Sequence, residues 1–313
     1  MASKHFADRF IASARQLKNP LCVGLDPHLD LIPDEFGVRL DKPNSDRTAQ
    51  GVFEFLRLVV DECANKVPVV KPQIAFFEQL GWRGLRVLEQ LTQHARSLGL
   101  LVVLDAKRGD IGSTAEAYAR SYLYPESPCQ VDALTVNPYL GVDSLAPFLK
   151  AAKLGETGLF VLAKTSNRGS GEFQDLFSDG ARLFQKVARA LRAHADALVG
   201  MSGWSSIGIV AGATFPADAK ELRQTLPNSL FLIPGFGAQG GQLQSAFASF
   251  LPGDANLEGG LISSSRGILF GDASASRTED WRVAFRSRLQ LTVNQLSDVV
   301  QGVSSQMPGA HPK

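Results

Sequence analysis

Cysteine and histidine are scarce in this chain, and their scarcity excludes several classes of site. Cys22, Cys63 and Cys129 are the only cysteines, and they form neither a C-x-x-C pair nor a spacing typical of a metal site. The five histidines include no H-E-x-x-H pattern, so no catalytic zinc is expected. Widely spread cysteines in an odd number indicate buried, reduced thiols in a cytosolic protein.

Long hydrophobic runs and an excess of either charge are also lacking. No segment approaches the roughly 20 apolar residues that span a bilayer. The first 15 residues indicate an amphipathic helix rather than a signal peptide, with Phe6, Phe10, Ile11 and Ala14 on one face. The formal net charge is +1, from 32 basic and 31 acidic residues, which suggests no nucleic-acid or membrane partner. We therefore expect a soluble cytoplasmic protein whose anion sites are made locally.

Short apolar runs are what the sequence has in number. Each is rich in Val, Ile, Leu or Phe and is flanked by Gly, Pro or polar residues, which is typical of buried parallel strands. Segments with helical patterns separate most of them. The runs are 21–25, 67–70, 100–104, 133–136, 158–163, 207–211, 230–233 and 261–264. The helical segments are 48–66, 80–98, 114–122, 145–153, 181–193, 217–225, 243–250 and 280–296.

Eight strands that alternate with helices indicate a (β/α)8 barrel, the TIM-barrel fold. An open doubly wound sheet is the alternative. Eight units within roughly 250 residues, without a break in composition, favour the barrel. We predict one catalytic domain over 1–302, including the N-terminal helix, and a disordered tail over 303–313, which is polar and contains Pro and Gly.

Active sites of such barrels lie at the carboxyl ends of the strands, so residues that follow the runs are the candidates. The densest group follows the third run and contains Asp105, Lys107 and Asp110. Because strand side chains alternate with a period of two, Asp105 and Lys107 are predicted to point together into the mouth, within reach of Lys71. A structural Lys–Asp network at the rim is the alternative; the convergence of several charges favours a functional site.

Asp110 lies in the loop before a predicted helix. The residues from Ser113 to Glu116 fit the S-x-x-E capping box, which assigns the helix cap to Ser113 and leaves Asp110 without that role. Asp110 is then either a functional carboxylate or a solvated turn residue.

A glycine-rich segment follows the seventh run. Gly235, Gly237 and Gly240 match G-x-G-x-x-G, and Glu258 lies at the distance expected of the acidic partner in a dinucleotide site. That motif belongs in a first βα unit, however, whereas barrels often bind phosphate in the loops after strands seven and eight. With Arg266 after the eighth run, we interpret the segment as a phosphate site rather than as a flexible loop beside a surface arginine.

The segments at the strand ends together resemble the orotidine 5′-phosphate decarboxylase family, in its longer bacterial (type 2) form. The D-x-K-x-x-D element alone is shared with related phosphate-binding barrels, whereas the full series is specific and covers almost the whole chain. The matching segments are 24–27, 70–72, 76–78, 105–112, 137–139, 165–167, 212–214, 234–241 and 265–267.

The resemblance implies decarboxylation of orotidine 5′-phosphate to uridine 5′-phosphate by a homodimer that uses no metal or other cofactor. Lys107 would donate the proton, in an array with Lys71, Asp105 and Asp110, and the partner subunit would contribute Asp110 together with Thr114. The implied substrate contacts are Asp26 and Lys71 for the ribose hydroxyls, Ser166 for the pyrimidine, and Gln239, Arg266, Gly237 and Gly267 for the phosphate.

Three other functions stay open at this point. A metal-assisted barrel enzyme acting on a sugar phosphate would need a carboxylate pair for magnesium near Asp105. A nicotinamide-dependent oxidoreductase would use the glycine-rich segment. A catalytically inactive barrel that only binds nucleotides would not require Lys107 beside two aspartates.

Overall fold

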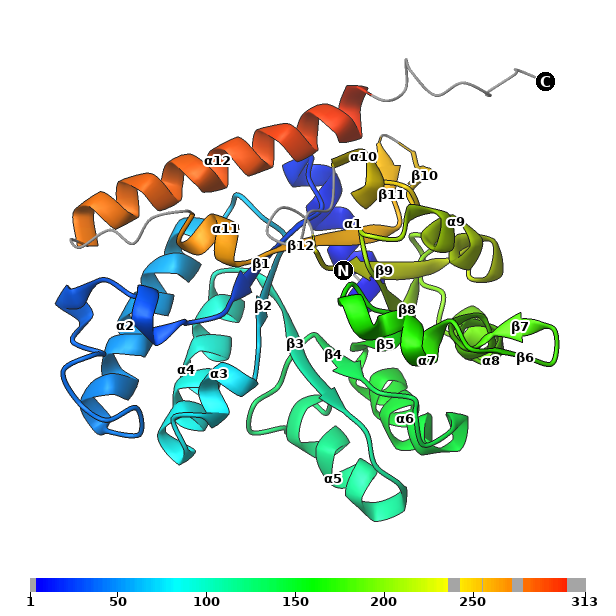
Figure 1. The fold of residues 1–313 in the computed structure, drawn as a ribbon, viewed down its shortest axis with the longest axis horizontal. Coiled ribbons are helices and arrows are strands. Elements are labelled where there is room, and N and C mark those ends of the chain that lie inside the picture. The colour runs from blue at the N-terminus through cyan, green and yellow to red at the C-terminus, as the bar shows by residue number, and fades with distance from the viewer. Residues whose placement is uncertain (1–3, 236–242, 255, 272–277, 303–313) are drawn as a thin grey trace.

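A computed structural model describes residues 4–235, 243–254, 256–271 and 278–302, and within them eight parallel strands close into a barrel (Figure 1). Each strand pairs with the next one along the barrel, and β1 pairs with β12 to close it, with Leu21 opposite Ile262. The predicted fold is thereby confirmed. The barrel strands are β1 (Leu21–Leu25), β2 (Val69–Pro72), β3 (Leu101–Arg108), β4 (Ala133–Val136), β5 (Gly158–Lys164), β8 (Ser205–Ala211), β9 (Ser229–Ile233) and β12 (Gly260–Ser264).

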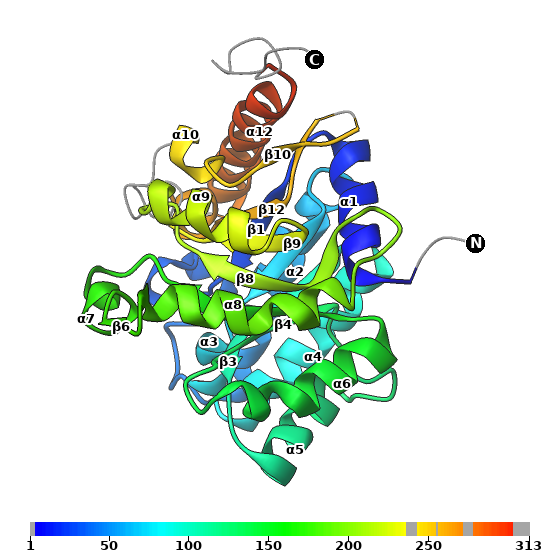
Figure 2. The same cartoon turned by 90° about the vertical axis from the view of Figure 1, so that its right-hand side faces the viewer.

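Helices surround the barrel, and their positions agree with the predicted segments to within a few residues at most ends. In the view turned by 90°, α8 lies beside β8 on the outer surface, and α9 packs against α8 (Figure 2). Two short antiparallel hairpins were not predicted: β6 (Phe177–Ser178) with β7 (Ala181–Arg182), and β10 (Leu251–Pro252) with β11 (Leu257–Glu258). The helices are α1 (Phe6–Leu17), α2 (Asp46–Cys63), α3 (Ala75–Glu78), α4 (Trp82–Ser97), α5 (Gly112–Tyr122), α6 (Ala146–Gly155), α7 (Gly171–Gln174), α8 (Leu183–Asp196), α9 (Pro216–Thr225), α10 (Leu243–Ala246), α11 (Arg266–Leu269) and α12 (Thr278–Gly302).

The strands divide their side chains between two apolar cores. Val69, Val103 and Ala133 belong to the core inside the barrel, whereas Val70 and Leu104 belong to the core beneath the helices. This alternation follows from the period of two along a strand. Because both faces of each strand are covered, the runs are continuously apolar, as parallel strands require.

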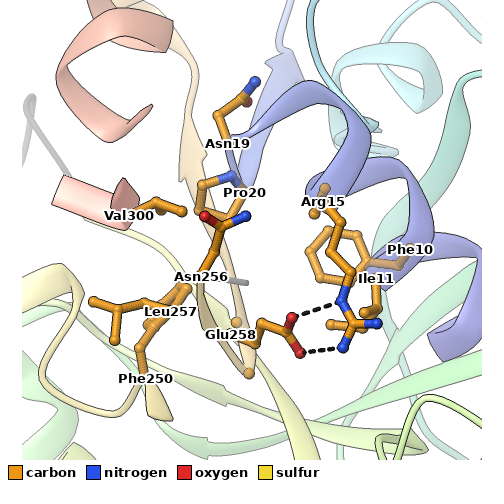
Figure 3. A pocket seen from close by; sticks show the side chains of 13 residues that line it. Phe10, Ile11, Arg15, Asn19, Pro20, Phe250, Asn256, Leu257, Glu258 and Val300 are labelled. Carbon is orange, nitrogen blue, oxygen red and sulfur yellow. Dashed lines mark hydrogen bonds and ion pairs between the residues drawn. The ribbon is translucent and has the colours of Figure 1, made fainter. Parts of the chain in front are cut away.

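Helix α1 covers the amino-terminal end of the barrel. The ring of Phe6 meets that of Phe160 edge to face, with centroids 5.9 Å apart. A Cβ at position 158 would lie 2.3 Å from Phe6 Cδ1, so glycine is required for this approach. Arg15 on α1 donates to both carboxylate oxygens of Glu258, at 2.7 and 3.1 Å (Figure 3). This end of the barrel is therefore sealed by apolar side chains and a bidentate ion pair.

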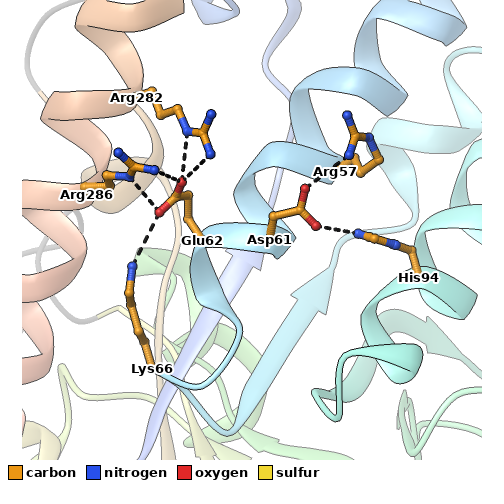
Figure 4. A network of polar contacts seen from close by, with 7 residues as sticks. All are labelled: Arg57, Asp61, Glu62, Lys66, His94, Arg282 and Arg286. Carbon is orange, nitrogen blue, oxygen red and sulfur yellow. Dashed lines mark hydrogen bonds and ion pairs between the residues drawn. The ribbon is translucent and has the colours of Figure 1, made fainter.

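An ion-pair cluster connects α12 to α2 (Figure 4). Glu62 on α2 is buried and accepts hydrogen bonds from Arg282 and Arg286 on α12, at 2.6–2.8 Å, and from Lys66 at 3.4 Å. The hydrogen bond from Arg286 is the largest cause that lowers the pKa of Glu62, to about 2. The last helix is thus held against the first helix of the outer layer by charge-assisted hydrogen bonds.

The predicted helix cap at Ser113 is wrong. Helix α5 begins at Gly112, its N-cap residue is Ile111, and no side chain caps it. Gly112 adopts a positive φ of 53°, a conformation that glycine permits at little cost, so the chain enters the helix before Ser113. The side chain of Asp110 instead accepts a hydrogen bond from the N–H of Ile111, at 2.7 Å.

Other predictions concern the ends of the chain and its apolar segments. The predicted N-terminal helix is confirmed, with Phe6, Phe10 and Ile11 buried. The predicted tail, 303–313, lies outside the described residues. Within the described part of the chain, no helix has the length and apolar character needed to cross a bilayer.

Candidate active site

The barrel interior changes from apolar to polar at the carboxyl ends of the strands. Two residues beyond Val69 and Val103, the same face carries Lys71 and Asp105. These two side chains help to line a cavity of about 740 Å³. The residues around it come from strands β2, β3, β5, β8, β9 and β12 and from segments that follow strands, including the one after β1. This is the end at which a barrel presents its catalytic groups.

Asp105 lies at the centre of a cluster of charges. Its Oδ2 is 3.2 Å from Nζ of Lys71, and its Oδ1 is 2.6 Å from Nζ of Lys107. Oδ1 also accepts a hydrogen bond from the hydroxyl of Thr135, at 2.9 Å. The side chain of Lys71 is only 8% exposed, whereas that of Lys107 is 46% exposed. One carboxylate therefore holds a buried ammonium and an accessible one.

The electrostatics of the cluster keep its charges in place. Burial disfavours the charged form of Lys71, but the attraction of Asp105 and Asp26 outweighs it and raises the pKa of Lys71 above its ordinary value. Burial would also raise the pKa of Asp105, but the ammonium groups of Lys71 and Lys107 hold it well below its usual range. The aspartate is thus ionised and Lys71 protonated at neutral pH, as paired buried charges require.

Lys107 reaches Asp105 through an irregular backbone. Its φ is +48°, and the register between β3 and β4 shifts between Leu104 and Arg108. The hydroxyl oxygen of Thr135 accepts hydrogen bonds from the backbone N–H groups of Ala106 and Lys107, both at 2.9 Å. The prediction that Asp105 and Lys107 point into the mouth is confirmed, but a left-handed residue held by Thr135 produces this, not regular alternation.

A second carboxylate, Asp26, follows β1. Its Oδ2 accepts a hydrogen bond from the hydroxyl of Ser265. A Cβ at Gly24 would lie 2.6 Å from Cβ of Ser265, so the glycine allows β1 and β12 to bring these residues together. Oδ1 of Asp26 is buried and has no hydrogen-bond partner among the described residues. A buried unpaired acceptor beside a cavity is suited to a ligand hydroxyl.

The loop after β5 forms the opposite side of the cavity, with Thr165, Ser166 and Asn167. A Cβ at Gly212 would lie 2.8 Å from Cα of Ser166, so the end of β8 packs directly against this loop. The hydroxyl of Thr214 donates to the carbonyl oxygen of Ser166, at 3.5 Å. Ser166 is thus held between neighbouring strand ends.

The structure brings most of the predicted site residues together. Asp26, Lys71, Asp105, Lys107, Ser166 and Arg266 all line the cavity, as does Gly235 of the glycine-rich segment. Asp110, Thr114 and Gly267 are not among its lining residues, and Thr114 and Gly267 are exposed. Gly237 and Gln239 lie outside the described residues.

Sequence reasoning missed several residues of the site. Thr135 is a polar residue in the interior row of β4, two positions beyond Ala133, so strand alternation would have identified it. His28, Gln73 and Gln174, which line the cavity, were missed as well. They lie in a loop, just after a strand or at the end of the four-residue helix α7, where no spacing rule indicates the direction of a side chain.

The structure argues against a dinucleotide site, because Glu258, the acidic residue that such a site would use, lies elsewhere in the barrel. Glu258 lies before β12, at the amino-terminal end of the barrel, where it is bound by Arg15 (Figure 3). It also accepts a hydrogen bond from Trp204 Nε1 at 3.0 Å. Among the residues that the structure describes, no group of three or more His, Cys, Asp or Glu side chains is arranged to hold a metal ion.

Charged and polar groups around a nucleotide-sized cavity, at the carboxyl mouth of a closed (β/α)8 barrel, define an enzyme active site. A family model described as orotidine 5′-phosphate decarboxylase / HUMPS family matches residues 19–277. The orotidine 5′-phosphate decarboxylase of Rhodopirellula baltica is 42% identical over 283 residues, which cover 89% of this chain and 91% of that protein. The chain therefore belongs to the orotidine 5′-phosphate decarboxylase family of carboxy-lyases.

Solved structures agree over nearly the full length. A crystal structure from Streptomyces avermitilis, of a candidate orotidine 5′-phosphate decarboxylase, aligns with a TM-score of 0.77 and 35% identity, over 96% of this chain and 97% of that one. The structure of Leishmania donovani OMP decarboxylase aligns with a TM-score of 0.70 and 30% identity, over 94% of this chain and 98% of that one. The alignments thus cover these proteins and this chain almost end to end.

Proposed function

We propose that this chain decarboxylates orotidine 5′-phosphate to uridine 5′-phosphate in pyrimidine biosynthesis, with Lys107 protonating C6 and no cofactor taking part. The observation that carries the proposal is the cluster in which Asp105 holds both Lys71 and Lys107 at the cavity. The named relatives support the choice of substrate. A cytoplasmic location and a homodimer are further parts of this proposal.

The chemistry requires a fixed positive charge beside C6. Loss of CO2 leaves an electron pair on C6 that no neighbouring π system can accept. An ammonium held in a water-poor cavity stabilises that charge and can then donate its proton. Lys107 meets both needs because Asp105 fixes its Nζ at 2.6 Å and its side chain is half exposed to the cavity mouth.

The substrate contacts follow from the cavity wall. The unpaired Oδ1 of Asp26 would accept a ribose hydroxyl, with Lys71 as the neighbouring donor. Ser166 would contact the pyrimidine from the opposite side. Arg266, with Gln239, Gly237 and Gly267, would bind the phosphate; a guanidinium can form two parallel hydrogen bonds to it.

Asp110 and Thr114 are proposed to act on the partner subunit's cavity. Within one chain neither residue lines the cavity. Residues around the start of α5 are available for such a role because Ile111 is 61% exposed and Thr114 is exposed as well. Asp110 would complete a formally neutral array with Lys71, Asp105 and Lys107, which lowers the cost of burying the charges on dimerisation.

The test of the reaction is the loss of orotidine 5′-phosphate absorbance with purified protein and excess chelator. Wild-type protein and a Lys150→Ala control, altered at an exposed lysine, should both turn over the substrate. Lys107→Ala should lose nearly all turnover while keeping its thermal midpoint. Turnover that depends on a metal would favour the sugar-phosphate alternative, and near-normal turnover by Lys107→Ala would remove that residue from the chemistry.

The shared site has its own test. Lys107→Ala and Asp110→Ala homodimers should each be nearly inactive. Mixing them should restore part of the activity, because a hybrid dimer would contain one site with neither substitution. If subunit exchange is demonstrated and no activity returns, each site is made by a single chain.

A further inference from the structure

Lys164, the last residue of β5, is a buried lysine that the proposed reaction does not use. Its side chain is 1% exposed. Its Nζ lies 2.6 Å from Oδ1 of Asp175 and 3.8 Å from Oδ2 of Asp218. The rings of Phe215 and Phe184 lie 4.4 and 5.5 Å from it. A lysine enclosed in this way is retained only where its partners balance the cost of burial.

The two carboxylates do not depend on Lys164 equally. Asp218, on α9, is also bound by Arg182 at 3.1 Å. Among the described residues, Asp175 forms no second ion pair, so Lys164 is its main electrostatic partner. Because Asp175 directly follows α7, this ion pair fixes the end of that helix to the barrel.

Gln174, the last residue of α7, transmits this anchoring to the cavity. Its Oε1 accepts a hydrogen bond from the backbone N–H of Thr165 at 2.9 Å, and its Nε2 donates to the hydroxyl of Thr165 at 2.8 Å. That hydroxyl donates in turn to Oδ1 of Asn167, at 2.6 Å. Gln174, Thr165 and Asn167 all line the cavity. Thr165 and Asn167 flank Ser166 in the sequence, and Gln174 contacts Thr165. The buried ion pair at Asp175 is therefore joined to the loop that faces the cavity through the adjacent residue Gln174 and its hydrogen bonds to Thr165.

We propose that Lys164, Asp175 and Gln174 are positioning residues that hold the 165–167 loop in place for the pyrimidine base. They would thereby set the preference of the site for a nucleotide over a ribose phosphate without a base. The inference rests on the proposed function, in which Ser166 contacts the pyrimidine. In the proposed function the phosphate is bound at Arg266, the first residue of α11 after β12, and none of these contacts involves Arg266.

The test compares two ligands on the full-length protein by titration calorimetry: uridine 5′-phosphate and ribose 5-phosphate. Wild-type protein should bind uridine 5′-phosphate more tightly. Gln174→Ala should weaken that binding about tenfold, the effect of losing hydrogen bonds worth roughly 1.4 kcal/mol, and leave ribose 5-phosphate binding within twofold. Lys164→Met should act in the same direction. Lys186→Met, which breaks the exposed ion pair with Asp179 at 2.7 Å, is the matched control and should change neither ligand.

The outcomes separate this inference from the proposed function. If Gln174→Ala weakens both ligands alike, or neither, the positioning role is refuted, whatever the wild-type activity. If Lys164→Met fails to fold, Gln174→Ala, a partly exposed position, still decides the question. Wild-type protein that discriminates between the ligands but does not decarboxylate orotidine 5′-phosphate would refute the reaction and keep the positioning role. Wild-type protein that does not discriminate would refute the inference directly.

Discussion

Thr135→Val is the substitution that tests most sharply how the cluster is built. Valine has nearly the same shape as threonine, so the change removes the hydroxyl and little else. The hydroxyl oxygen accepts from the N–H groups of Ala106 and Lys107 and donates to Asp105, each at 2.9 Å. An unsatisfied buried donor costs roughly 1–3 kcal/mol, and a bond to a charged group contributes about 1.5–3 kcal/mol. Allowing for relaxation, we expect a loss of about 3 kcal/mol.

This loss should appear in both stability and activity. For a chain of this size it corresponds to a fall of about 5 °C or more in the thermal midpoint. Lys107 has a φ of +48°, and without Thr135 its backbone should relax and move Nζ. A displacement of about 1 Å at a catalytic group can reduce turnover roughly 100-fold. Thr135→Ser keeps the oxygen and should retain most of both properties. A Thr135→Val protein with unchanged kcat and midpoint would refute the role of this hydroxyl.

Three further predictions address other parts of the molecule. Arg266→Ala should raise the Kd for uridine 5′-phosphate at least tenfold while leaving uridine binding unchanged, by titration, since charge-assisted bonds contribute about 1.5–3 kcal/mol; equal losses for both would argue against a phosphate contact. Gly212→Ala places a Cβ 2.8 Å from Cα of Ser166 and should lower kcat/KM in the absorbance assay; unchanged kinetics would show that the loop can shift freely. The pKa of Glu62 is lowered to about 2 from 4.5, so its stabilisation is complete above about pH 4.5 and is lost as the pH falls toward 2. Urea midpoints between about pH 6 and pH 3 should therefore fall less in Glu62→Gln than in the wild type, and parallel falls would contradict this.

The fold was predictable because the strands are buried on both faces. β1 and β4 lie at the predicted residues, since a strand enclosed by two cores is apolar throughout. β3 extends to Arg108, beyond the predicted end at Leu104, because its last residues are polar side chains of the site while the backbone still pairs, with Arg108 opposite Val136. The two-residue strands of the hairpins are too short to show either the strand period of two or the helical period of about 3.6.

The site was predictable only where strand geometry decides the direction of a side chain. Lys71 and Asp105 occupy interior positions of adjacent strands, so alternation and strand order together bring them into contact. The left-handed backbone of Lys107 and the hydrogen bonds of Thr135 depend on a β-bulge, which no sequence pattern here predicts. The proposed role of Asp110 involves a second copy of the chain, and the sequence indicates it only through the resemblance.

The different burial of the two lysines favours Lys107 over Lys71 as the proton donor in the proposed reaction. Lys71 is nearly enclosed, and the attraction of Asp105 and Asp26 raises its pKa. Loss of a proton from Lys71 would therefore leave these two carboxylates without the positive charge that balances them. A lysine that protonates C6 must also recover a proton from water in every cycle. Lys107 is 46% exposed and is also paired with Asp105, so water can reprotonate it without the barrel opening. Substitution of Lys71 should therefore weaken ligand binding and displace Asp105, whereas substitution of Lys107 should stop turnover with binding of uridine 5′-phosphate largely kept.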